Sequence, residues 1–224
     1  MNDASPSNDT HKRGLVIAVD GPAASGKGTI ARALAKRFNL PHMDTGVLYR
    51  AAALNLWRWG GDPASDFEAV RACNDLGSNL EDPELRSEAV SKFASTISAY
   101  PSVREALLQR QRDFAAQQGG AVLDGRDIGT VIAPDADVKL FVTASIEVRA
   151  QRRVRELLER GMPGHYAEVL CDLKSRDDRD SNRSLAPLAR ADGAVLLDTS
   201  EMSAEEAIAQ AIQAVERSME KRRA

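Results

Sequence analysis

The sequence predicts an α/β fold built on a parallel β-sheet. Five short apolar runs, rich in β-branched residues, alternate with helical patterns, which is typical of βαβ units. Four of these runs end in aspartate. A glycine-rich segment, "VDGPAASGKGT" (19–29), joins the first run to a helix. Because the carboxyl ends of parallel strands border the ligand crevice, we expect a polar site at that edge of the sheet.

The expected strands are, in chain order, 15–20, 41–44, 121–124, 138–143 and 194–198. The first ("LVIAVD") and the last ("AVLLD") are apolar on both faces, which predicts buried strands. The second ("PHMD") depends mainly on the segments that flank it. Between residues 62 and 100 no strand pattern occurs, so we expect helical segments laid over the sheet there.

The start signals of three helices can be read directly. "SVRE" (102–105) and "SAEE" (203–206) have the pattern of a capping box, in which a serine is followed three residues later by a glutamate. The segment 145–161 begins with a capping serine, Ser145, and ends at Gly161. The last helix has an apolar stripe, which predicts a face turned to the core. Its members are Ala207, Ile208, Ala211, Ile212 and Val215.

The composition is that of a single globular domain, 15–224, preceded by a flexible tail, 1–14. The chain has 224 residues, of which 43% are apolar and 28% charged. A net charge of −3 argues against a nucleic-acid partner. No apolar run approaches the ~20 residues of a membrane helix, and the one near the start is too short for a signal peptide. Two cysteines far apart and three scattered histidines predict a reduced cytoplasmic protein without a histidine metal site.

The glycine-rich segment is a P-loop of variant form. Gly21, Gly26 and Lys27 fit the pattern G-x-x-x-x-G-K-[ST], but Gly28 takes the hydroxyl position and Thr29 comes one residue later. Backbone N–H groups and the helix dipole of such a loop bind phosphate oxygens, and the lysine neutralises the β- and γ-phosphates. "GKGT" resembles the form found in nucleoside monophosphate kinases, which hold Mg²⁺ largely through water and nucleotides. We expect ATP phosphates to contact Gly21, Pro22, Ala23, Ala24, Ser25, Gly26, Lys27, Gly28 and Thr29.

Two further segments follow predicted strands and carry anion-binding groups. "MDTGVLYR" (43–50) leads into a helix with Tyr49 and Arg50, which predicts an anion pocket opposite the P-loop. In "LDGRDIGT" (123–130), Arg126 offers a planar fork for phosphate and Asp127 a fixed acceptor.

Arginines elsewhere are open to two interpretations. The run "SRDDRDSNR" (175–183) is either a solvated face or a mobile segment whose arginines close over the transferring phosphoryl group. Arg104 lies in the first turn of a predicted helix, 102–118, where the dipole disfavours a cation by roughly 0.3–1 kcal/mol. Either an anionic ligand or a salt bridge would offset that cost.

Five blocks in order make the chain similar to the bacterial cytidylate kinases of the nucleoside monophosphate kinase family. They span most of residues 15–197 and read "IAVDGPAASGKGT", "MDTGVLYRAAAL", "ASTISAYPSVREALLQRQRDF", "LDGRDIGTVIAPDADVKLFVTAS" and "RDDRDSNRSLAPL". The resemblance implies a five-stranded parallel sheet with helices on both faces, an insertion that binds the nucleoside monophosphate (about 60–100) and a lid (about 155–183). The stretch 74–90 has no strand pattern, which indicates a member with a short insertion.

The resemblance also implies roles for single residues. Lys27, Arg176 and Arg179 would be catalytic, the two arginines lying on the lid near the transferred phosphoryl group. Arg50 and Arg126 would hold the CMP phosphate, with Thr45 beside them. Ser95, Arg104 and Asp127 would read the cytosine, and Asp180 and Arg183 would contact the ribose and its surroundings. We therefore expect a monomer that transfers a phosphoryl group from ATP, with Mg²⁺, to CMP or dCMP.

The chemistry of the base fits this expectation. Cytosine carries an exocyclic amine that a carboxylate such as Asp127 can accept from, whereas uracil has an oxygen there. The accepting phosphate is already anionic, so no general base is needed. The alternatives are a P-loop kinase for another small acceptor, such as UMP or shikimate, and a nucleotide-driven switch or motor. The absence of an N-K-x-D motif and of a strand ending in Asp-Glu argues against the second.

Overall fold

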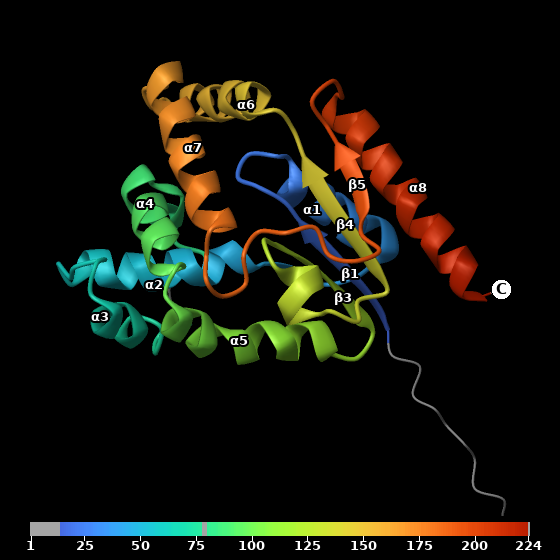
Figure 1. Cartoon of the computed structure of the whole chain (residues 1–224), viewed down its shortest axis with the longest axis horizontal. Helices are drawn as coiled ribbons and strands as arrows, with labels where there is room; N and C mark the ends of the chain where they lie inside the picture. Colours follow the sequence, from blue (N-terminus) through green and yellow to red (C-terminus); the bar gives the residue numbers. More distant parts are fainter. Residues whose placement is uncertain (1–13, 78–79, 224) are drawn as a thin grey trace, which may run out of the picture.

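The computed structural model describes residues 14–77 and 80–223, which form one parallel sheet with helices on both faces (Figure 1). The strands are β1 (Leu15–Asp20), β2 (His42–Asp44), β3 (Gly120–Gly125), β4 (Val138–Thr143) and β5 (Val195–Asp198). They run parallel in the order β2-β3-β1-β4-β5. All five expected strands and the α/β fold are thus confirmed. The predicted tail, apart from Gly14, lies outside the described residues.

The helices are α1 (Lys27–Phe38), α2 (Thr45–Arg58), α3 (Asp66–Arg71), α4 (Glu88–Ile97), α5 (Pro101–Ala116), α6 (Ile146–Glu159), α7 (Tyr166–Ser181) and α8 (Ala204–Arg223). A 3-10 turn, η1 (Pro83–Arg86), precedes α4, and a π-helical turn, η2 (Ile128–Ile132), follows β3. In the described part of the chain no helix is long and apolar enough to cross a membrane.

The core follows the alternation of side chains along the central strand. Ile17 and Val19 of β1 pack with α1 and α8, whereas Val16 and Ala18 pack with α5 and η2. All four side chains are fully buried. Because apolar side chains on both faces must be covered, the sheet lies between two helical layers. The predicted stripe of the last helix, α8, faces this core: Ala207, Ala211 and Val215 are buried, and Ile208 and Ile212 pack beside them.

The prediction that the last strand is buried was wrong. β5 is an edge strand that pairs only with β4, and Val195 and Leu196 are 40% and 50% exposed. Only Leu197 joins the core, on the side of α8. An apolar run indicates a strand, but its composition does not say whether a second strand and a helix will cover it.

One of the predicted capping boxes was also wrong. α5 begins at Pro101, whose fixed φ angle and missing N–H suit the first turn, so Ser102 lies inside the helix. The hydroxyl of Ser102 donates to the carboxylate of Asp66 in α3 instead. The second box is confirmed, since Glu206 N–H donates to the Ser203 hydroxyl at 3.2 Å and Ser203 N–H donates to the Glu206 carboxylate at 2.8 Å.

Between α2 and α5 the described residues form α3, η1 and α4, joined by turns and loops and without a strand, as predicted. α4 packs against α2 and lies beside α7, so the insertion meets the predicted lid over the carboxyl edge of the sheet (Figure 1). α6 and α7 pack against each other, and α6 begins with Ser145, whose hydroxyl accepts from Val148 N–H as expected. The same edge of the sheet therefore receives residues from the P-loop, from α4 and from α7.

Candidate active site

The P-loop connects β1 to α1 and has the backbone geometry of an anion cradle. A Cβ atom at Gly21 would lie 2.0 Å from the Val142 carbonyl oxygen of β4, so only glycine fits there. Gly26, at φ +90°, precedes α1 and provides no side-chain cap. The first N–H groups of α1 therefore have no capping side chain among the described residues, and the start of this helix is suited to bind an anion.

Lys27 lies among cationic and anionic neighbours at the start of α1. Burial and the Arg126 guanidinium lower the pKa of Lys27 to about 8, while Asp124 and Asp44 oppose the shift. A phosphate beside Lys27 would favour the charged form and raise this pKa. Asp124 and Asp44 only partly offset the burial of the Lys27 ammonium group. A bound phosphate would provide the remaining negative charge.

Two cavities meet at the P-loop. The inner cavity, of about 230 Å³, lies between the P-loop, the end of β3, α2, α4, α5 and α7. The outer cavity, of about 480 Å³, lies between the P-loop, α6 and the start of α8. Ala24, Lys27 and Gly28 line both cavities. Two ligands could therefore lie on either side of the P-loop lysine.

The structure brings most of the predicted site residues to these cavities. The inner cavity is lined by Ala23, Ala24, Lys27, Gly28, Thr45, Arg50, Ser95, Arg104, Arg126, Asp127, Arg176, Asp180 and Arg183. The outer cavity is lined by Ala24, Ser25, Gly26, Lys27, Gly28 and Thr29. Gly21 and Pro22 line neither cavity, and Arg179 lines a smaller cleft between α4 and α7.

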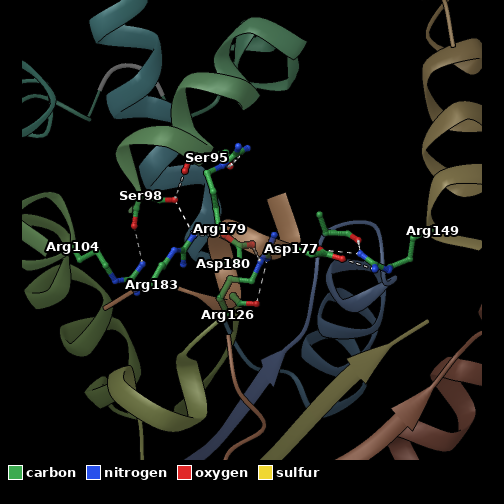
Figure 2. Close-up of polar contacts among 11 residues, drawn as sticks. Ser95, Ser98, Arg104, Arg126, Arg149, Asp177, Arg179, Asp180 and Arg183 are labelled. Atoms are coloured by element: carbon green, nitrogen blue, oxygen red, sulfur yellow. Dashed lines mark hydrogen bonds and ion pairs between the residues drawn. The ribbon is translucent and has the colours of Figure 1, made fainter. Parts of the chain in front are cut away.

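Asp180 of α7 pairs with two arginines, Arg126 just after β3 and Arg183 just after α7 (Figure 2). Its carboxylate accepts from Arg126 Nε at 2.8 Å and from Arg183 Nη2. Although burial opposes ionisation, Arg126 and Arg183 hold the pKa of Asp180 below its usual range. Arg183 also donates to the Ser98 hydroxyl at 2.9 Å, which ties α7 to the end of α4.

Arg104 and Asp127 form a buried ion pair in the inner cavity, each side chain being 7% exposed. Arg104 also donates to the Ser98 carbonyl at 3.3 Å and lies over the Tyr49 ring, 5.6 Å from its centre. Of the two interpretations of a cation in the first turn of α5, the structure therefore shows the salt bridge. Both partners still border the cavity, so the pair can also contact a ligand.

The two predicted catalytic arginines of α7 have different surroundings. Arg176 borders the inner cavity, and its buried Nε has no hydrogen-bond partner among residues 14–77 and 80–223. Burial and the neighbouring Arg126 lower the pKa of Arg176 to about 10. Arg179 instead donates to the Ser95 hydroxyl of α4, from Nη2 at 3.0 Å and from Nε at 3.2 Å (Figure 2). The structure therefore does not bring Arg179 to the inner cavity.

The remaining predicted residues of the acceptor side are held by neighbours. The Thr45 hydroxyl donates to the Asp124 carbonyl at 2.9 Å, and Arg50 pairs with Asp44 at 2.7 Å. These contacts join the ends of β2 and β3 to α2. In the outer cavity, the Thr29 hydroxyl accepts from Arg32 at 3.4 Å.

Three carboxylates in or beside this site were absent from the predicted set: Asp44 and Asp124 line the inner cavity, and Asp20 supports it through η2. Asp20 and Asp44 end β1 and β2, and Asp124 is the second-last residue of β3. The aspartates that close the apolar runs in the sequence were the signal that could have identified them. Asp20 accepts the N–H groups of Ile128 and Gly129, both at 2.8 Å, which fixes η2 and with it Asp127. Burial raises the pKa of Asp20 to about 7, against those hydrogen bonds.

The donor set at this edge is compatible with a metal held mainly through its ligands. The Asp124 carboxylate lies beside the P-loop, since a Cβ at Gly28 would be 3.7 Å from its Oδ2, and His42 fixes its other oxygen at 2.7 Å. No group of three or more His, Cys, Asp or Glu in the described ranges could enclose a metal ion. Mg²⁺ commonly keeps waters and binds through one or two carboxylates and phosphates, which fits this arrangement.

The chain is similar to known proteins in sequence and in fold. A family model described as "Cytidylate kinase" matches residues 17–217. A cytidylate kinase of Rhodopseudomonas palustris is 52% identical over 203 residues, covering 90% of this chain and 96% of that protein. One of Xanthobacter autotrophicus is 55% identical over 205 residues, covering 90% and 97%. A crystal structure of an uncharacterized protein from Eubacterium ventriosum shares the fold, with a TM-score of 0.54 at 14% identity over 90% of this chain and 98% of that one.

Proposed function

The chain belongs to the cytidylate kinase family, and we propose that its two cavities hold the two nucleotides of this kinase reaction. The protein is a transferase that phosphorylates CMP at the expense of ATP. In our assignment CMP or dCMP binds in the inner cavity, and ATP binds in the outer cavity with its phosphates on the P-loop. The alternative acceptor kinases, for UMP or shikimate, are not favoured by the relatives.

The observation that carries the assignment is the position of Lys27. It borders both cavities, so phosphates that approach from the two sides would meet beside its ammonium group. In-line transfer requires the accepting oxygen and the γ-phosphorus to face each other along one line. A P-loop shared by two cavities is compatible with that arrangement.

The inner cavity has suitable partners for each part of CMP. Arg50 and Arg126 would grip the phosphate, with Thr45 beside them. The buried pair of Arg104 and Asp127, together with Ser95, would read the cytosine edge. Asp180 and Arg183 would contact the ribose. The polar contacts among these residues hold them in place before the nucleotide arrives, which lowers the entropic cost of binding.

Catalysis would then consist of positioning and charge stabilisation. Lys27 and Arg176 face the place where negative charge spreads over the transferring phosphoryl group. The accepting oxygen of CMP is already ionised, so no residue has to remove a proton. Arg179 would act indirectly, by holding the Ser95 hydroxyl. Mg²⁺, held through water by carboxylates such as Asp124 and Asp44, would offset the charge of the ATP phosphates.

The organisation of the chain extends this proposal. We assign residues 15–224 to a single kinase domain, with about 60–100 as the insertion for the acceptor nucleotide and about 155–183 as the lid. We expect a cytoplasmic monomer that does not bind nucleic acid. Closure of the lid would exclude water, which would otherwise compete with CMP for the phosphoryl group.

A panel of acceptors tests the proposal. CMP, dCMP, UMP, AMP and shikimate are each supplied with Mg·ATP, and ADP formation is measured together with the phosphorylated product. We expect CMP and dCMP to be phosphorylated with a much higher kcat/KM than the others. A matched panel with Arg126→Met should raise KM for CMP far more than for ATP. Equal effects on both nucleotides would contradict the assignment of the inner cavity to CMP.

A further inference from the structure

We propose that Arg149 and Asp177 form a clamp that sets the position of the lid helix α7 over the P-loop and so places Arg176 in the inner cavity. The clamp is a pair of positioning residues, since neither lines the inner or the outer cavity. The inference extends the function proposed above and rests on it.

Arg149 joins three separate segments through one buried guanidinium group (Figure 2). Its Nε donates to the Ala144 carbonyl, before α6, at 3.0 Å. Its Nη1 donates to the Ala23 carbonyl of the P-loop at 3.2 Å. The fork then closes on the Asp177 carboxylate of α7, with Nη1 to Oδ1 at 3.1 Å and Nη2 to Oδ2 at 2.6 Å.

This geometry uses properties that only arginine has. A guanidinium offers donors in a fixed plane, so it can bind a carboxylate through two parallel hydrogen bonds and still donate to two carbonyl groups. The side chain of Arg149 is 6% exposed, and Asp177 is the acidic partner of its ion pair. Because a buried cation without its acidic partner is unfavourable, the Arg149 guanidinium favours the position of α7 that brings Asp177 into contact with it.

The orientation of α7 follows from the clamp and from one further contact. Asp177 points to Arg149 on the side of α6, whereas Asp180, three residues later, binds Arg126 on the side of the inner cavity. Residues three apart on a helix project roughly 60° from each other, so two contacts with different partners one turn apart fix the rotation of α7 about its own axis. Arg176 immediately precedes Asp177, so this rotation decides whether its guanidinium faces the cavity.

The link to Ala23 gives the clamp a second consequence. Ala23 belongs to the P-loop and borders the inner cavity, so the backbone that binds the donor phosphates is connected to the lid by two successive hydrogen bonds through Arg149. Binding of the donor nucleotide alone should therefore stabilise α7. Without the clamp, the donor nucleotide should still bind, but its binding should no longer stabilise α7.

The test compares Asp177→Asn with Asp178→Asn, its exposed neighbour on the same helix, in the full-length chain. We expect Asp177→Asn to lower kcat at least tenfold with KM for ATP and CMP within about threefold, because a displaced Arg176 affects the transition state more than binding. Asp178→Asn should leave kcat unchanged, and Asp177→Glu should recover part of it. Arg149→Lys should lower kcat similarly, and the double variant should be little worse than either single one.

Hydrogen exchange of the α7 amides, with and without a non-hydrolysable ATP analogue, gives a readout independent of turnover. In the wild type the analogue should slow exchange in 166–181, and in Asp177→Asn it should not, while exchange in β1 and β3 stays the same. Equal protection of α7 in both proteins, or an unchanged kcat in Asp177→Asn, would overturn the clamp. A wild type that fails to phosphorylate CMP would refute the proposed function, and the exchange comparison would still judge the clamp.

Discussion

The ion pair between Arg104 and Asp127 allows the base-reading assignment to be tested by a single substitution, Asp127→Asn. The change removes a negative charge from the inner cavity and keeps the size of the side chain. Both partners are 7% exposed, so the free energy of unfolding and the choice of nucleotide should both respond. Each response can be estimated from the contacts of the pair.

The loss of stability follows from the burial of Arg104. Removing one partner of a buried ion pair costs roughly 3–5 kcal/mol, because the other charge stays buried. Here Arg104 keeps the Ser98 carbonyl at 3.3 Å and the Tyr49 ring at 5.6 Å, and asparagine still offers an acceptor oxygen. We therefore expect a loss of about 3 kcal/mol, at the lower end of that range.

The loss of selectivity follows from the chemistry of the two pyrimidines. A hydrogen bond to a charged group contributes roughly 1.5–3 kcal/mol, and each 1.4 kcal/mol corresponds to about tenfold in affinity or rate. The preference for CMP over UMP, expressed as the ratio of kcat/KM values, should therefore fall by roughly 10–100-fold. An asparagine amide can donate to the uracil oxygen, which makes UMP a better substrate of the variant.

Urea unfolding and steady-state kinetics with both nucleotides measure the two effects. The control is Glu216→Gln, which breaks an ion pair with Arg37 whose side chains are 55% and 41% exposed, and should cost at most about 1 kcal/mol. If Asp127→Asn destabilised the fold no more than this control, the buried pair would not stabilise it as argued. If the folded variant kept its preference for CMP, Asp127 would not read the base.

Three other residues of the site give further predictions. Lys27→Ala should lower kcat by roughly 10²–10³-fold without unfolding the protein, as checked by kinetics and circular dichroism. Because the pKa of Lys27 is about 8 in the free chain and phosphate favours its charged form, ATP binding should take up protons near pH 8 and weaken above it, by calorimetry in two buffers. The pKa of Asp20, raised from 3.8 to about 7, means that the folded state keeps a proton that the unfolded chain releases. Stability should therefore fall as pH rises between these values, and the slope should be smaller in Asp20→Asn, as measured by urea unfolding across that range. Arg176→Met should reduce kcat by roughly 10²-fold while leaving the free energy of unfolding unchanged or up to about 1 kcal/mol higher, a combination that thermal unfolding and turnover together detect.

Much of the fold was predictable because its signals are local. Short β-branched runs and a P-loop determine where strands end and helices begin, and these depend on neighbours in sequence. The wrong predictions concern which strand is covered by other elements and which of two residues starts a helix. Nothing in "AVLLD" says that Val195 and Leu196 lie at an edge. Ser102 has the pattern of an N-cap, but α5 begins one residue earlier, at Pro101.

The sequence indicated many of the residues that line the site, but not which of them form ion pairs with each other. Motifs identified Arg126, Asp127 and Arg183, but the acid that neutralises Arg104 comes from a segment 23 residues away. Arg149 lies in a helix with several arginines, and its spacing does not distinguish it from those on the solvated face. Only the packing of α6 and α7 shows which guanidinium is buried and which carboxylate it meets.

The distribution of charge in the inner cavity explains why Arg176, of all its arginines, is suited to act on the transferring group. Arg50, Arg104, Arg126 and Arg183 are each paired with an aspartate. Arg176 has no ion pair with any residue in the described part of the chain, and its Nε is buried without a partner. Burial and the neighbouring Arg126 make this unpaired cation unfavourable in the free protein, and both lower its pKa to about 10. Charge that develops on a phosphoryl group in this cavity removes that unfavourable interaction, so the stabilisation grows as the transition state is approached. The paired arginines cannot contribute as much, because an aspartate already balances the charge of each before the nucleotide binds.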